Sequence, residues 1–115
     1  MSRNPLARLS RQSDATATVF AALGDSTRLS LVLSLSRGNC QSIARLTESR
    51  LLTRQAISKH LRILEDAGVV SSRREGRENL FALNPQALDE LRSYVEQISE
   101  QWDASLARLK AFVEK

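Results

Sequence analysis

The chain has 115 residues, enough for one domain with a modest core, since domains commonly run to about 100–150 residues. Aromatic residues make up only 4% of the composition, so the core is expected to consist of Leu, Ile, Val and Ala. A single cysteine excludes an internal disulfide, and no apolar run reaches the roughly 20 residues that a membrane span needs. These features favour a globular cytoplasmic protein with no membrane partner.

The formal net charge is +4, and it is unevenly distributed along the chain. Residues 41–77 carry eight basic and four acidic side chains, a net charge of +4, whereas residues 86–115 carry four basic and six acidic ones, a net charge of −2. The basic middle segment favours a polyanionic partner, and the acidic end favours a separate role. The alternative is that the arginines only keep exposed helices soluble.

Helical patterns fill the first half of the chain. Residues 1–13 hold three arginines and no acid, and they are expected to form a disordered basic arm. Asp14 is the expected N-cap of a first helix that Gly24 ends, and Asp25 is the expected N-cap of a second helix, because apolar residues recur at intervals of three and four after each cap. A third helix is expected over residues 41–49.

The fourth helix has the strongest periodicity in the chain. Thr53 is expected to cap it, Ile57, Leu61 and Leu64 to face the core, and Gly68 to end it. The exposed side would then carry only side chains that can hydrogen-bond to a base edge or a phosphate, with no acid among them in its first turns.

The pattern then changes from helix to strand and back. Residues 69–73 and 79–83 are expected to form two strands of a hairpin with Gly76 in its turn. Asn84 and Pro85 supply the cap and the first position of a long last helix. Its apolar residues alternate at three and four over a length greater than one small domain needs to cover, which favours pairing with a second copy. The alternative is a helix that folds back on its own core.

Together the elements predict a mainly α fold with a β-hairpin wing, a winged helix-turn-helix of five helices whose last helix pairs with a second copy. The expected units are the arm (residues 1–13), a DNA-binding domain (residues 14–84) and a dimerisation helix (residues 85–115) within the same compact unit. The expected dimer-interface residues are Phe20, Leu88, Leu91, Val95, Ile98, Trp102, Leu106 and Leu109.

In a helix-turn-helix protein the second helix docks in the major groove of DNA. Basic wing residues commonly follow phosphate or enter the minor groove, although Glu75 and Glu78 partly offset them here. His60 is included because an imidazole can contact phosphate, and packing against the third helix is its alternative. The candidate DNA-binding residues are Arg54, Gln55, Ser58, Lys59, His60, Arg62, Arg73, Arg74 and Arg77.

From about Val19 to its C-terminus the chain resembles the ArsR/SmtB-type winged-helix repressors, through "ALGDSTRLSLVLSL", "QSIARLTESRLLTRQAISKHLRILEDAGVV" and "SSRREGRENLFALNP". Residues 53–61 are the most specific part. Where the family usually has Asp-Pro-Thr-Arg, this chain has a serine, Ser26, in second place. The resemblance implies a homodimer that is joined through its first and last helices and binds an imperfect palindrome. It also implies that the dimer blocks transcription and releases DNA when an effector binds. The final segment, "QWDASLARLKAFVEK", resembles the branch often encoded beside small START-like proteins.

The resemblance does not extend to a metal site. Metal-sensing members use a Cys-x-Cys type cluster or Asp/His clusters on the last helix, whereas here Cys40 precedes Gln41 and Ser42 and the last helix has no His. Zinc normally takes three or four N, S or O ligands, so no metal and no cofactor are expected, and the effector is not identified. A metal- or thiol-redox-responsive repressor that uses Cys40 is one alternative function, and a winged-helix module that binds protein instead of DNA is another.

An enzyme is not expected from this sequence. The chain has no Gly-rich phosphate loop, and its single His is not part of a recognisable nucleophile–base–acid set. A protein-binding face would be expected to expose more apolar or mixed-charge surface than the acid-free side of the fourth helix. The residues therefore favour a DNA-binding function over both of these classes.

Overall fold

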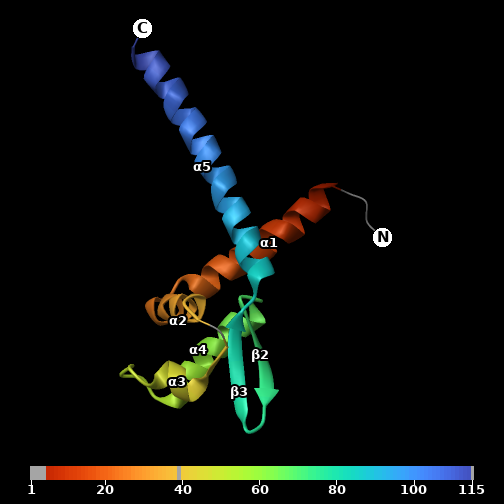
Figure 1. Ribbon diagram of the computed structural model, residues 1–115. Coiled ribbons are helices and arrows are strands. Elements are labelled where there is room, and N and C mark those ends of the chain that lie inside the picture. The colour runs from red at the N-terminus through yellow and green to blue at the C-terminus, as the bar shows by residue number, and fades with distance from the viewer. Residues whose placement is uncertain (1–4, 39, 115) are drawn as a thin grey trace.

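The computed structural model describes residues 5–38 and 40–114, and within them the chain forms five helices and three short strands (Figure 1). This architecture confirms the predicted mainly α fold with a hairpin wing. In chain order the elements are α1 (Pro5–Leu23), α2 (Ser26–Ser36), β1 (Gln41–Ser42), α3 (Ile43–Thr47), α4 (Arg54–Asp66), β2 (Val70–Glu75), β3 (Glu78–Leu83) and α5 (Pro85–Val113).

Short polar side chains begin three of the helices, as their sequence pattern predicted. Asp25, Thr53 and Asn84 each stand in extended backbone and accept a hydrogen bond from a backbone N–H two or three residues further on. Pro85 follows as the first residue of α5, where its missing N–H costs no helical bond. Gly68 follows α4 with a φ of 81°, a left-handed conformation that favours glycine.

The predicted start of the first helix is wrong. α1 begins at Pro5, so Asp14 lies inside the helix, and the residues expected as a disordered arm are helical from position 5 onward. The physical reason is that residues 6–13 contain no Gly or Pro and include Leu, Ala, Arg and Gln, which all have high helix propensity. The first four residues of the expected arm lie outside the described part of the chain.

The third helix is shorter than predicted, because its expected first residues belong to a strand. Gln41 and Ser42 form β1, and α3 follows with the Ser42 hydroxyl as its N-cap. The sheet has the order β1-β3-β2 with antiparallel pairing throughout, and Gln41 lies opposite Phe81. The wing is the β2–β3 hairpin, which turns at Gly76 with a φ of 63°. A third strand therefore anchors the wing to the helical body.

The hydrophobic core lies where helices α2, α3 and α4 meet the base of the wing. Ile57, Leu61 and Leu64, the residues predicted to face inward from α4, are all fully buried. Leu31 from α2 and Val69 before β2 are also fully buried and belong to the same cluster. This core fixes α4 between α2 and the wing, with one face left toward solvent.

A sharp corner joins α1 to α2. The segment Ser13–Leu23 meets α2 at 96°, with Gly24 at the corner. A Cβ added to Gly24 would lie 3.3 Å from the Ala21 carbonyl oxygen, so the corner leaves little room for a side chain. Within the described residues no single helix has the length and apolar composition to cross a membrane, and this bent pair meets that test only when its two helices are taken together.

Helix α5 differs from the rest of the molecule because none of its residues is buried. Its 29 residues give a helix about 43 Å long, at 1.5 Å per residue. The start of α5 lies beside α1, where Phe20 and Tyr94 make an edge-to-face contact with ring centroids 6.0 Å apart. The remainder extends away from the body, and its free end is far from the wing (Figure 1).

Candidate nucleic-acid interface

The exposed side of α4 carries the predicted stripe of polar and basic residues. Its side chains are all exposed, while Ile57, Leu61 and Leu64 on the other side are buried. At about 100° per residue the stripe covers roughly 140° of the helix surface. We call this the α4 stripe: Arg54, Gln55, Ser58, Lys59 and Arg62.

An open groove of about 440 Å³ lies between the start of α4, the start of α3 and the wing. It brings together four of the candidate residues, three from the α4 stripe and one from the wing tip. Lys59 and Arg62 do not line it and lie on the stripe beyond it. The lining residues are Ser42, Ile43, Ala44, Arg54, Gln55, Ser58, Arg77, Glu78 and Asn79.

Strand geometry separates two wing arginines that the sequence grouped together. Arg74 lies opposite Asn79 in the hairpin register, and residues directly opposite share a face of the sheet, so Arg74 lies on the face of the groove residue Asn79. Arg73 is next to it in the strand and therefore lies on the other face, where its guanidinium pairs with the Glu75 carboxylate at 3.3 Å. Arg77 is the wing arginine that lines the groove, and Arg74 lies on the sheet face of the groove residue Asn79.

One hydrogen bond ties the wing to α4. The Ser72 hydroxyl donates to a Glu65 carboxylate oxygen over 2.5 Å. Ser72 and Arg74 are two residues apart in β2, so they lie on the same face of the sheet. The bond therefore helps to hold the groove-facing side of the wing at a fixed distance from α4.

His60 does not lie with the other candidates. It is two residues from Arg62, so it lies about 160° around the helix from it, and its side chain is only 23% exposed. Its Nδ1 atom is 3.2 Å from the Arg28 guanidinium and 3.7 Å from the Asp25 carboxylate, both from the start of α2. The structure thus places His60 against the α1–α2 corner instead of on the α4 stripe.

Arg50, in the turn between α3 and α4, makes internal hydrogen bonds that the sequence did not indicate. Its guanidinium donates to the hydroxyls of Ser30 and Ser34 on α2, at 2.7 and 2.9 Å, and its Nε donates to the Leu46 carbonyl at 2.7 Å. Because α3 has only five residues, these bonds matter for holding it against α2. One arginine of the basic middle segment is therefore structural.

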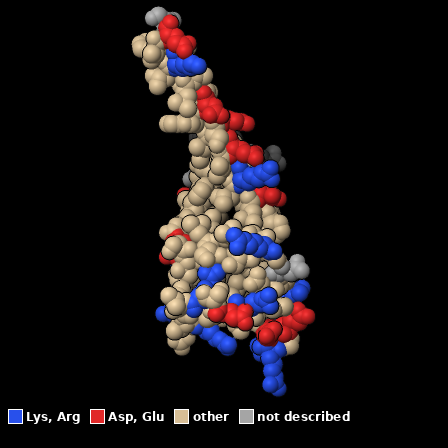
Figure 2. All heavy atoms as spheres, turned by 60° about the vertical axis from the view of Figure 1, so that its left-hand side comes forward, with Lys and Arg blue, Asp and Glu red and all other residues tan. Residues whose placement is uncertain are grey.

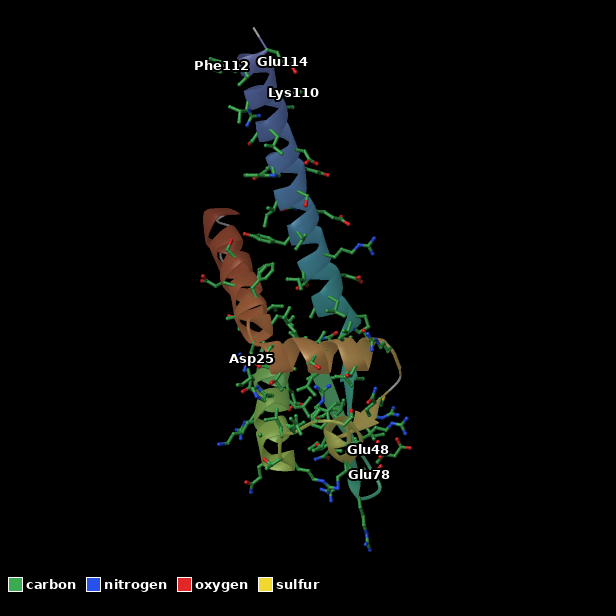
Figure 3. All side chains as sticks on the ribbon, turned by 90° about the vertical axis from the view of Figure 1, so that its left-hand side faces the viewer. Asp25, Glu48, Glu78, Lys110, Phe112 and Glu114 are labelled. Carbon is green, nitrogen blue, oxygen red and sulfur yellow. The ribbon has the colours of Figure 1, made fainter. Side chains whose placement is uncertain are left out.

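Charged side chains of both signs occur at both ends of the molecule, but in different proportions (Figure 2). Lys and Arg are prominent on the body and the wing, whereas Asp and Glu recur along α5 (Figure 2). Two acids, Glu48 and Glu78, lie at the same end as the groove, far from the tip of α5 with Phe112 and Glu114 (Figure 3). The basic end of the molecule is thus also the end that holds the groove.

The predicted dimer-interface residues form a largely uncovered apolar face on α1 and α5. Leu88 and Leu91, near the body, are partly buried, and the other six are exposed. Exposure is greatest far from the body, at 64% for Trp102 and 59% for Leu109. Phe112, beyond these residues, is 75% exposed and extends the same face.

Metal ligands do not gather in the described part of the chain. No group of three or more His, Cys, Asp or Glu residues lies close enough there to hold an ion. Cys40 is a partly buried free thiol just before β1. His60 and Asp25 approach each other, but the third neighbour of this pair is the Arg28 cation.

A short helix, a turn, a capped second helix and an anchored hairpin with a groove between them define a winged helix-turn-helix protein. A solved structure described as an ArsR-like transcriptional regulator from Rhodococcus sp. RHA1 superposes with a TM-score of 0.74 at 36% identity, over 87% of this chain and 93% of that one. The HTH-type transcriptional regulator YuzN of Bacillus subtilis, itself described as uncharacterized, is 42% identical over 79 residues, which are 64% of this chain and 86% of the relative.

A third relative, the arsenic resistance transcriptional regulator ArsR1 of Pseudomonas putida, is 30% identical over 87 residues, covering 73% of this chain and 68% of the relative. Residues 31–86 also match a family model for the C-terminal domain of SoFic-like protein adenylyltransferases. That match runs from the second half of α2 through the wing, which is most of the winged-helix part of the fold. The chain belongs to the ArsR family of HTH-type transcriptional regulators.

Proposed function

We propose that the protein is a homodimeric, sequence-specific repressor that binds a palindromic operator in the cytoplasm. The observation that carries this proposal is the groove between α4 and the wing, where Arg54, Gln55 and Ser58 stand beside Arg77. A major groove about 12 Å wide admits an α-helix, and these side chains match the hydrogen-bonding groups of base edges and phosphates.

Each side chain has a role that follows from its position. Gln55 and Ser58 line the groove without charge, so they are suited to base edges, and an amide can pair with adenine at two points. The other stripe residues are cations that suit guanine or phosphate. Arg74 and Arg77 on the wing would neutralise flanking phosphates, and Asn79 is added to the candidates because it lines the groove.

Dimerisation is supported by the uncovered apolar face of α1 and α5. Soluble proteins rarely leave a long contiguous apolar face exposed unless it is an interface. Two copies related by a two-fold axis would present two α4 helices to one duplex, with half-sites separated by about 34 Å or a multiple of it. A dimer bound over a promoter would block transcription by occupying the DNA.

The first experiment is selection of duplexes from a random-sequence library, followed by binding titrations of the selected duplex and a scrambled one at several salt concentrations. Selective binding that weakens steeply with salt is the expected result. If the two duplexes bind equally and salt has no effect, the DNA-binding role is wrong and a protein-binding module becomes the better interpretation.

Three variants then test the site. Gln55→Ala should cost about 1–3 kcal/mol for the preferred base at one position and relax selectivity there. Arg74→Ala should weaken all duplexes alike and lower the salt slope by about one, whereas its neighbour Arg73→Ala, on the other face of the wing, is the matched control and should change little. If Gln55→Ala weakened every duplex equally, the assignment of α4 as the recognition helix would be wrong.

A further inference from the structure

Three polar side chains connect the middle of α4 to the α1–α2 corner. Asp25 caps α2 and accepts a hydrogen bond from the Arg28 backbone N–H at 3.0 Å. The Arg28 side chain reaches both ways from α2: its Nε donates to the Ala22 carbonyl in the last turn of α1, and its terminal nitrogen lies 3.2 Å from His60 Nδ1. A single guanidinium therefore joins the dimer helix α1 to α4.

The chemistry of this contact fixes the roles of its two partners. A guanidinium has only donors, so in this hydrogen bond the Arg28 N–H donates and His60 Nδ1 accepts. A hydrogen bond with a charged partner is stronger than one between neutral groups, and this one is only partly exposed. The linkage thus depends on one acceptor atom at one position of the imidazole.

The position of His60 separates this linkage from the DNA-binding surface. It lies on the side of α4 away from Arg62 and against the corner, so it can influence DNA only through the placement of α4. α1 contributes Phe20 to the exposed apolar face that is proposed to contact a second copy. A rigid connection from α1 to α4 would therefore fix how far apart two α4 helices stand in a dimer.

We propose that the Arg28–His60 linkage sets the spacing of the two recognition helices, and that His60 is a positioning residue and not a DNA contact. This inference rests on the proposed function, since it needs a dimer that binds two half-sites at once. A dimer gains affinity from binding two half-sites only when its geometry allows both α4 helices to bind at once. Loosening the α1–α2 corner would reduce that gain, while the contacts of each α4 helix with its own half-site stay intact.

The test uses the full chain and two duplexes: the sequence that the wild-type protein selects from a random library, and a duplex of the same length in which one half is scrambled. His60→Asn places an amide oxygen where Nδ1 stood and keeps the acceptor, whereas His60→Gln moves the oxygen one bond further out. Arg28→Lys tests the other partner, because an ammonium replaces the fork that reaches two acceptors at once. Thermal melting and sedimentation of each variant establish that it is folded and dimeric.

We expect His60→Asn to bind the full site with an affinity within about twofold of wild type. His60→Gln and Arg28→Lys should each lose about tenfold in affinity for the full site, with little change in affinity for the half-scrambled duplex. The inference is overturned if the Gln variant binds the full site as tightly as wild type, if the Asn variant binds as weakly as the Gln variant, or if affinity for both duplexes falls equally. Should His60→Gln fail to fold, Arg28→Lys and His60→Asn decide the question alone. A wild-type chain that selects no sequence overturns the proposed function itself, and the linkage inference with it.

Discussion

The winged-helix body and helix α5 differ in where their apolar side chains are buried. Every buried apolar side chain in the described residues lies between Ala22 and Phe81, and α5 buries none. The body completes its core within one chain, whereas α5 carries its apolar residues on a face that its own chain leaves open. Because most helix stability in proteins comes from packing, this helix depends on an assembly in a way that the body does not.

The largest expected effect is on the body. Leu61→Ala should lower the free energy of unfolding by about 2–5 kcal/mol, because it removes a fully buried side chain and leaves a cavity. Urea unfolding should give the same loss at low and high chain concentration if the body is stable by itself. If the loss of stability vanished at high chain concentration, the body would also depend on a second copy for its stability. That result would contradict this difference between the body and α5.

A charge on the open face of α5 should give the next largest effect. Ile98→Asp should weaken self-association by about 100-fold, because it would bury an unpaired carboxylate between the apolar faces of the two copies, while the fold of the body should be unchanged. Analytical ultracentrifugation and far-ultraviolet circular dichroism measure the two properties. Glu100→Gln, two residues further along α5 and outside the apolar face, is the control. Unchanged association of Ile98→Asp would show that the dimer forms elsewhere.

A smaller effect is expected where the two regions meet. Phe20 and Tyr94 form the aromatic contact between α1 and α5, and an edge-to-face pair contributes about 0.5–1.5 kcal/mol beyond its buried area. A double-mutant cycle with Phe20→Leu and Tyr94→Leu, measured by unfolding at a chain concentration that saturates association, should return a coupling energy of that size. Additive single effects would mean that α5 is not fixed to α1 through these rings.

The smallest effect concerns Asp25 at the corner and appears only in acid. The hydrogen bond from the Arg28 backbone N–H, followed by the charge of the Arg28 guanidinium, lowers the pKa of the Asp25 carboxyl below its usual value of 3.8. A lowered folded-state pKa stabilises the fold above pH 3.8, and this contribution is lost as the pH falls through the folded-state value. Asp25→Asn keeps a capping oxygen without the titration, so its stability relative to wild type should improve below about pH 4. A constant difference down to pH 2 would contradict the assignment.

Local signals explain how much of the fold the sequence could predict. Capping residues such as Thr53 and Asn84 act within one turn of the helices that they begin. Gly76 indicates the hairpin turn by itself, because the turn occurs at the glycine. The prediction for the start of α1 was wrong because Asp14 lies inside a helix that begins nine residues earlier, at Pro5. β1 was missed since a two-residue strand has no periodicity, and its partner Phe81 is distant in sequence.

The candidate site shows the same division between local and distant information. The exposure of Gln55 and its stripe neighbours follows from helix periodicity alone, but the groove depends on where the wing folds back. The separation of Arg73 from Arg74 required the strand register, and the position of His60 required knowledge of Arg28, which lies 32 residues earlier. The sequence therefore indicates which residues form the α4 stripe, and the contacts that position α4 come from distant residues.

The serines that hold Arg50 have a consequence for protein engineering. Ser30 and Ser34 lie on α2, and a scheme that raises helix propensity would replace both with alanine for a gain of a few tenths of a kcal/mol each. In this fold that exchange would remove the side-chain acceptors of a guanidinium and loosen the turn between α3 and α4. Design by helix propensity should therefore leave both serines in place, since their hydroxyls bind an arginine in a turn outside their own helix.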